Sequence, residues 1–170
     1  MISKPTEYTP NAYFKSIIDA VPEEDLISAL VNSRVETIDL IQNISATKES
    51  YAYAEGKWNI KQLFQHVIDC ERVFCYRGLS IARGDTQKLP GFDDQLFVDN
   101  DYTQRVDLNT IGEDYAVSRL ATISLFKTIQ PDVLDFEGNG NGIVVTPRIV
   151  GWFIAGHNYH HNKIIRERYL

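Results

Sequence analysis

Apolar residues recur at helical spacing in four long stretches of the chain, and polar residues fill the positions between them. The last stretch, residues 146–170, begins with Thr146 and Pro147, which are typical of a helix start. At about 100° per residue, His157 lies near the middle of the following apolar stripe, His161 lies one turn later, and His160 lies toward the flank. The stripe is formed by Ile149, Val150, Phe153, Ile154, Ile164 and Ile165.

Three earlier stretches predict three more long helices. The first opens at residues 22–25, where acidic side chains favour a helix N-terminus. The second spans about residues 58–82, and the third spans about residues 108–129, with capping-box spacing between Thr110 and Glu113. The first of these helices is expected to bury a stripe formed by Leu26, Ile27, Leu30, Val31, Ile38 and Ile41.

The segments between the long helices carry further signals. Residues 1–20 include Tyr8 and several apolar residues, which predicts a short helix or a packed arm. Residues 84–106 form a long loop without secondary structure, a type of segment that is often functional. The glycine-rich run at 138–142 predicts a small hairpin or tight turn. The residues expected to anchor the long loop over the bundle are Phe92, Leu96 and Phe97.

Together these elements predict an all-α fold in a single domain over residues 1–170. The expected architecture is a four-helix bundle with a long crossover loop between the second and third helices. Bundles of this kind build metal and ligand sites in their cores from side chains on facing helices.

Composition and charge narrow the classes of function. The net charge of −6 disfavours nucleic acid or an anionic membrane surface as a partner. No apolar run approaches the ~18–20 residues of a membrane span, and the first residues lack a signal-peptide pattern, so we expect a cytoplasmic protein. Cys70 and Cys75 lie five residues apart on one predicted helix, which separates their Cα atoms by roughly 8–9 Å and favours reduced thiols.

Two carboxylates on the second predicted helix are candidates for a role at a site. Glu71 falls inside the apolar stripe and therefore needs a partner, which is either an arginine, the favoured interpretation, or a histidine that it supports. Asp69 lies one turn beyond His66 and is either a solvated surface residue or a base that activates water. The candidate arginine partners of Glu71 are Arg72, Arg77 and Arg119.

All four histidines lie on two predicted helices that each have a buried face. His157 and His161, four residues apart, are able to share one ion, and His66 would supply a third nitrogen. Three protein ligands with one open position are typical of a catalytic metal site. The residues alone support equally well the alternative that these histidines only satisfy hydrogen bonds. His160 is expected to support a ligand or to pair with Glu71.

Three segments carry a resemblance to a known family: KWNIKQLFQHVIDCERVFCYRGLSIARGD, LPGFDDQLFV and IVGWFIAGHNYHHNKIIRERYL. They resemble the DinB-like family, whose wider superfamily includes transferases and isomerases that use mycothiol or bacillithiol. The resemblance covers about residues 51–170. It implies a four-helix bundle with a divalent-metal site of three histidines, which correspond here to His66, His157 and His161, while His160 matches a position that is not usually a ligand.

The resulting expectation is a metal-dependent enzyme that acts on a small molecule as a thiol S-transferase or a hydrolase. The ion would be zinc or nickel, and a low-molecular-weight thiol is a candidate cofactor. The alternative is a non-catalytic bundle whose metal is structural or sensory and whose surface binds a partner. A pocket at the fourth coordination position would favour the enzyme. The resemblance and the many tyrosine and phenylalanine residues also favour a homodimer.

Overall fold

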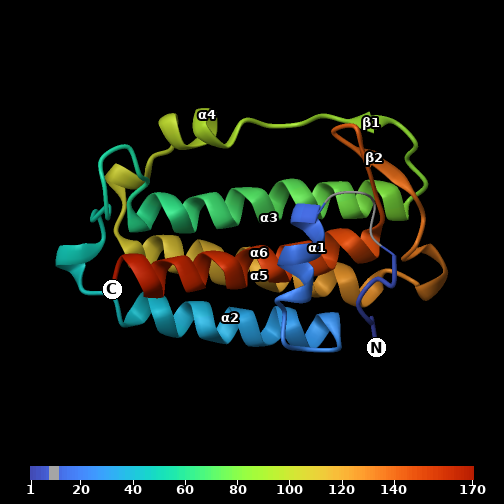
Figure 1. Cartoon of the computed structure of the whole chain (residues 1–170), viewed down its shortest axis with the longest axis horizontal. Coiled ribbons are helices and arrows are strands. Elements are labelled where there is room, and N and C mark those ends of the chain that lie inside the picture. Colours follow the sequence, from blue (N-terminus) through green and yellow to red (C-terminus); the bar gives the residue numbers. More distant parts are fainter. Residues whose placement is uncertain (8–11) are drawn as a thin grey trace.

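Four long helices pack side by side in the computed structural model, which describes residues 1–7 and 12–170 (Figure 1). The predicted all-α four-helix bundle is therefore confirmed. A short helix at Ala12–Asp19 also agrees with the prediction of a short helix or packed arm for residues 1–20, whereas Tyr8 lies outside the described residues. The α-helices are α1 (Ala12–Asp19), α2 (Leu26–Gln42), α3 (Ile60–Ala82), α4 (Asp94–Asp99), α5 (Leu108–Thr128) and α6 (Pro147–Arg168).

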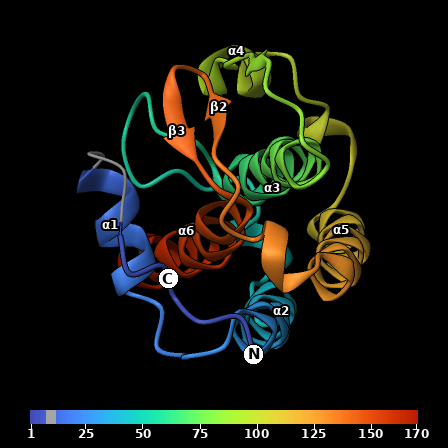
Figure 2. The same ribbon diagram turned by 90° about the vertical axis from the view of Figure 1, so that its right-hand side faces the viewer.

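The order of the helices around the bundle explains the long crossover. Each long helix contacts two others, in the cyclic order α6, α3, α5, α2, and α1 packs on the outer side of α6 (Figure 2). The colours of Figure 1 show that α3 and α5 run in the same direction, opposite to α2 and α6. The segment between α3 and α5 must therefore return along the whole bundle, and it does so over α3.

A small three-stranded sheet closes one end of the bundle. β2 (Gly138–Gly140) and β3 (Ile143–Val145) form an antiparallel hairpin, as predicted, and β1 (Lys88–Leu89) pairs parallel to β2. Asn141 and Gly142 both have positive φ, 57° and 86°, which suits a two-residue hairpin turn. The hairpin also holds the first part of the crossover segment in place, because the Leu89 carbonyl accepts a hydrogen bond from the Asn141 amide.

The prediction of a structureless loop over residues 84–106 is wrong, because β1, α4 and a 3-10 turn, η2 (Thr103–Arg105), lie within it. Of the three predicted anchors, Phe92 is half-buried and packs against the core, but Leu96 and Phe97 need correction. Leu96 and Phe97 are 57% and 39% exposed, whereas Leu89 and Val98 are 3% and 5% exposed. The short helix α4 is the reason: it turns Val98 toward the bundle and Leu96 and Phe97 away from it.

Helix starts follow their capping residues. Thr146 caps α6 by accepting a hydrogen bond from the Ile149 amide, as predicted. The predicted capping box of α5 is wrong, because Asp107 caps this helix by accepting from the Thr110 amide. The remaining 3-10 turns are η1 (Ala46–Lys48) and η3 (Pro131–Val133).

The buried face of α2 differs from its predicted apolar stripe. Val31 is exposed and Ile38 is half-buried, while Ser33 and Thr37 are fully buried. These two hydroxyls belong to a polar network inside the bundle, so the buried face of α2 combines polar and apolar side chains. None of the helices in the described residues is long and apolar enough to cross a membrane.

Candidate metal centre

Helices α3 and α6 bring three histidine side chains together inside the bundle. His157 Nε2 lies 3.0 Å from His161 Nε2 and 3.3 Å from His66 Nε2. All three side chains are buried, and one nitrogen of each lies within 4.8 Å of the others. The i, i+4 spacing on α6 stacks two imidazoles on one face, and the contact between α3 and α6 supplies the third.

Burial keeps these imidazoles uncharged. It lowers the pKa of His157 well below its usual value, an effect increased by the neighbouring His161 and His66. Burial, followed by the same kind of repulsion from His66 and His160, lowers the pKa of His161 to about 3. Burial also lowers the pKa of His66, although the charge of Asp94 opposes this shift. Neutral imidazoles carry the lone pairs that transition ions need.

The donor set fits a divalent transition ion. Three nitrogen atoms that face one another cannot all find hydrogen-bond partners among themselves, and the buried Nδ1 of His161 has no partner in the described residues. Zinc–nitrogen bonds of about 2.0–2.1 Å in a tetrahedral site place two ligand nitrogens about 3.3 Å apart. The separations of 3.0 and 3.3 Å around His157 are close to this value.

A pocket of about 360 Å³ opens over the three histidines. Helix α1 covers one side of it, because Gly156 lets the two helices approach closely: a Cβ at this position would collide with the backbone carbonyl oxygen of Ile17. Phe14 of α1 stacks on Phe153 of α6, with ring centroids 4.3 Å apart. The aromatic walls are formed by Tyr13, Phe14, Trp58, Phe74, Phe92 and Phe153.

Asp94 is a pocket residue that the sequence interpretation missed. Its Oδ1 lies 3.8 Å from His66 Nδ1, and the neighbouring Asp93 caps α4 and so fixes where Asp94 points. Trp58 holds the same segment by donating a hydrogen bond to Gln95, 3.1 Å away. The adjacent Asp93 and Asp94, after a Pro-Gly turn, were the available signal, but a loop interpretation does not show which bundle helix they approach.

The other candidates lie in three different places. Asp69 accepts a hydrogen bond from Gln65 in a separate open groove on the far flank of α3, so it does not reach the histidines. His160 lies on the rim of the pocket and does not pair with Glu71. Both Glu71 carboxylate oxygens are taken by Arg119, at 2.8 Å each, so the favoured arginine interpretation is correct.

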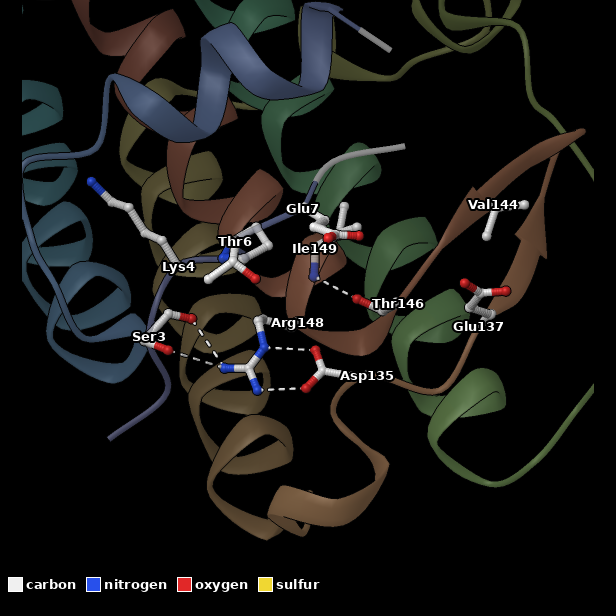
Figure 3. A pocket seen from close by; sticks show the side chains of 11 residues that line it. Ser3, Lys4, Thr6, Glu7, Asp135, Glu137, Val144, Thr146, Arg148 and Ile149 are labelled. Atoms are coloured by element: carbon white, nitrogen blue, oxygen red, sulfur yellow. Dashed lines mark hydrogen bonds and ion pairs between the residues drawn. The ribbon is translucent and has the colours of Figure 1, made fainter. Parts of the chain in front are cut away.

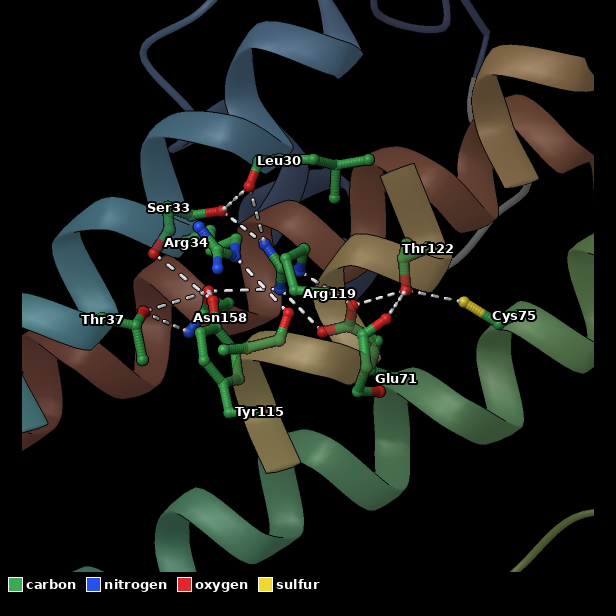
Figure 4. A network of polar contacts seen from close by, with 12 residues as sticks. Leu30, Ser33, Arg34, Thr37, Glu71, Cys75, Tyr115, Arg119, Thr122 and Asn158 are labelled. Carbon is green, nitrogen blue, oxygen red and sulfur yellow. Dashed lines mark hydrogen bonds and ion pairs between the residues drawn. The ribbon is translucent and has the colours of Figure 1, made fainter. Parts of the chain in front are cut away.

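The Glu71–Arg119 pair is the centre of a buried polar network (Figure 4). Arg119 of α5 also donates to Ser33 of α2 and to Asn158 of α6, and Thr122 donates to Glu71. Burial alone would lower the pKa of Arg119, but the adjacent carboxylate of Glu71 outweighs it and raises that pKa. The network thus joins all four long helices through one guanidinium group.

A second cavity, of about 430 Å³, lies at the end of the bundle where the N-terminal arm meets the start of α6 (Figure 3). Arg148 forms two hydrogen bonds of 2.7 Å with Asp135 there and donates to the Ser3 carbonyl. The described residues around this cavity include no histidine or cysteine.

We expect the metal-free protein to lose stability as the pH falls below about 6.5. His157 and His161 are neutral in the folded chain but gain a proton in the unfolded chain, so acid favours unfolding. Each of these two histidines lowers the free energy of unfolding by up to about 1.4 kcal/mol for every pH unit, until the pH reaches its pKa in the folded chain. Denaturant titrations at several pH values from 7 to 4 give the free energy of unfolding as a function of pH. This free energy should fall less steeply with decreasing pH in the variant His157→Gln/His161→Gln than in the unaltered protein. Equal slopes would contradict the prediction.

The fold and the site define a helical bundle with a buried group of three histidines at the base of a pocket. The chain belongs to the DinB superfamily, because the model of that family matches residues 29–165. No match was found among curated proteins.

Two solved structures share the fold. YfiT from Bacillus subtilis, described as a probable metal-dependent hydrolase with an unusual four-helix bundle topology, aligns with a TM-score of 0.75 at 14% identity. The alignment covers 96% of this chain and 90% of that chain. A mycothiol-dependent maleylpyruvate isomerase aligns with a TM-score of 0.69 at 12% identity, over 86% of this chain. The alignment spans 61% of that isomerase.

Proposed function

We propose that the chain is a metal-dependent hydrolase of small, largely apolar substrates, with His66, His157 and His161 as the ligands of one zinc or nickel ion. The observation that carries this proposal is the pocket over the three buried imidazoles. When bound, the ion supplies Lewis-acid chemistry, because it polarises a substrate carbonyl and lowers the pKa of a water molecule.

The pocket residues have separate roles in this proposal. The aromatic walls bind the apolar part of the substrate and exclude water from it. Asp94 supplies negative charge beside three neutral ligands, which offsets the cost of bringing in a divalent cation. Asp94 and His160 are the groups in the pocket lining that can accept a proton from an attacking water molecule.

The size of the pocket favours hydrolysis over thiol transfer. A volume of about 360 Å³ is near the lower end of ligand pockets, which span about 300–1,000 Å³. Hydrolysis needs room for one substrate and water, whereas transfer needs room for a thiol and its acceptor together. Thiol transfer is the competing reaction to test, because one structural neighbour is described as mycothiol-dependent.

The pocket also weighs against a purely structural metal. A structural zinc site is usually closed by a fourth protein ligand. Here the three histidines face a pocket whose aromatic walls could hold a ligand, an arrangement that a partner-binding bundle with a structural ion would not need.

We expect one tightly bound divalent transition ion per chain when the protein is purified without a histidine tag. Removing it with a chelator should lower the melting temperature, because an ion that binds only the folded state adds to its stability by about 2.7 kcal/mol at 100 times its Kd. Elemental analysis and calorimetry before and after chelation measure both effects. Metal-free protein whose melting temperature does not respond to chelation would contradict the proposal.

The hydrolase itself is tested with a panel of aryl esters and amides, assayed beside thiol transfer to electrophiles. We expect metal-dependent hydrolysis that is lost in His157→Ala and retained in the control Asp69→Asn, whose carboxylate lies outside the pocket. Thiol-transfer activity without hydrolysis would show that the proposed reaction is wrong and that the protein is a thiol transferase instead. Hydrolysis lost in Asp69→Asn would show that the base was assigned wrongly.

We also expect a homodimer, formed through the outer faces of α2 and α5. These adjacent helices expose Val31, Val35, Val117 and Leu120, apolar side chains that suit an interface. Light scattering should give twice the 19.4 kDa mass of one chain, and Val117→Lys/Leu120→Lys should return the monomer mass. A monomer mass for the unaltered chain at high concentration would remove this expectation.

A further inference from the structure

The pocket contains a second group of potential metal ligands that shares only His66 with the first. Cys70 lies one turn after His66 on α3, and its Sγ is 3.6 Å from each of the two ring nitrogens of His66, Nδ1 and Nε2. The Oδ1 of Asp94 lies 3.9 Å from Cys70 Sγ and 3.8 Å from His66 Nδ1. One atom of each residue therefore lies within 4.8 Å of the other two, as in the group of three histidines.

The separation between Asp94 and His66 is too long for a direct hydrogen bond. A nitrogen–oxygen distance of 3.8 Å exceeds the roughly 3.2 Å limit of a normal hydrogen bond. Tetrahedral zinc with nitrogen at about 2.0–2.1 Å and sulfur at about 2.3 Å separates these two donors by about 3.6 Å. The distance from Cys70 Sγ to His66 Nδ1 has this value, whereas Asp94 Oδ1, at 3.8 and 3.9 Å from these two atoms, would move closer to both when an ion binds.

We propose that His66, Cys70 and Asp94 form a second site for a thiophilic divalent cation such as zinc. It lies beside the three-histidine site and binds more weakly, because the buried Cys70 thiol must lose its proton and the Asp94 side chain is half exposed. The proposal shares His66 and Asp94 with the proposed function but does not otherwise depend on it.

His157 and Asp94 lie at different nitrogens of the His66 imidazole, and Cys70 Sγ lies at the same distance from both. Nε2 of His66 faces His157 at 3.3 Å, whereas Nδ1 faces Asp94 at 3.8 Å. The two nitrogens of an imidazole ring point in different directions, so a single ion cannot bind both. His66 would bridge the two positions as an imidazolate, after its remaining N–H proton is released to solvent.

Charge and access also favour the second position. A thiolate and a carboxylate together offset the charge of a divalent cation, which the neutral histidines do not. Thiolate is a preferred ligand of zinc. The Asp94 side chain is half exposed, so the position can be reached from solvent through the mouth of the pocket.

Cobalt(II) is the probe for the test, because sulfur ligation gives it a charge-transfer absorption band in the near ultraviolet. Reduced, tag-free protein should bind two equivalents of cobalt, and the band should appear with the second. Cys70→Ser should bind one equivalent without the band. Cys75→Ser is the matched control, because Cys75 lies on the same helix but contacts Thr122 at 3.1 Å, and it should bind two equivalents with the band.

Two further variants separate this inference from the proposed function. His161→Ala should lose the tight equivalent and keep the band, and Asp94→Asn should weaken the second equivalent by more than about 10-fold. One equivalent without a band in the unaltered protein would overturn the second site and leave the proposed function standing. A band that appears with a single equivalent, or that survives Cys70→Ser, would also overturn it.

Discussion

Alanine at His66, His157 or His161 should lower the affinity of the tight site for zinc or nickel by more than ~100-fold, whereas alanine at His160 should leave binding stoichiometric. Each of the first three residues supplies one of the nitrogens that converge inside the bundle. Loss of a residue that only orients a ligand costs about 10–100-fold, so loss of a ligand should exceed that range. Competition titrations with a chromogenic chelator measure all four variants.

His160→Ala is the matched control, because His160 is adjacent to His161 and points about 100° away from it around the helix. It lies on the pocket rim, where burial and the nearby Lys163 lower its pKa. The ligand assignment would be wrong if His160→Ala abolished binding while His161→Ala retained it. Circular dichroism of each variant separates lost ligation from lost folding.

Replacing Glu71 by alanine should destabilise the protein by about 3–5 kcal/mol, because it leaves the Arg119 guanidinium buried without its counter-charge. Arg119 is fully buried, and the two groups share two hydrogen bonds of 2.8 Å. Urea titrations at pH 7 measure the free energy of unfolding. A loss below about 1 kcal/mol would show that the pair behaves like an exposed one.

Two comparisons identify the buried charge as the cause. Arg72→Ala removes an ion pair with Asp114 in which both side chains are more than one-third exposed, and it should cost at most about 1 kcal/mol. The double variant Glu71→Leu/Arg119→Met removes both charges, so it should be more stable than Glu71→Ala. A double variant less stable than Glu71→Ala would show that packing and hydrogen bonds, not the unpaired charge, set the cost.

The positions of the helices could be predicted because their signals are local. Thr146 and Pro147 mark the start of α6 within one turn, and the hydropathy period marks its buried face. The same period fails for α2, whose inner face carries Ser33 and Thr37. Hydropathy treats a buried hydroxyl as exposed, whereas a partner on another helix makes its burial favourable.

The crossover segment was harder to predict because its structure depends on distant contacts. β1 is two residues long and exists only because β2, about fifty positions later, supplies its hydrogen bonds. Phe97 has the composition of an anchor but is exposed, since α4 presents Val98 to the bundle instead. No local pattern chooses between these neighbouring apolar residues.

The sequence by itself determined the helices, the placement of His157 and His161 on one helical face, and the family resemblance that selects His66, because these depend on residues close together in the chain or on matching motifs. Only the tertiary structure decided that Arg119 pairs with Glu71, and that Asp94 and Cys70 join His66 in the pocket. Those choices depend on how far each helix is rotated about its axis and on where the crossover segment crosses α3. Packing across the whole bundle fixes both, and no single stretch of sequence encodes them.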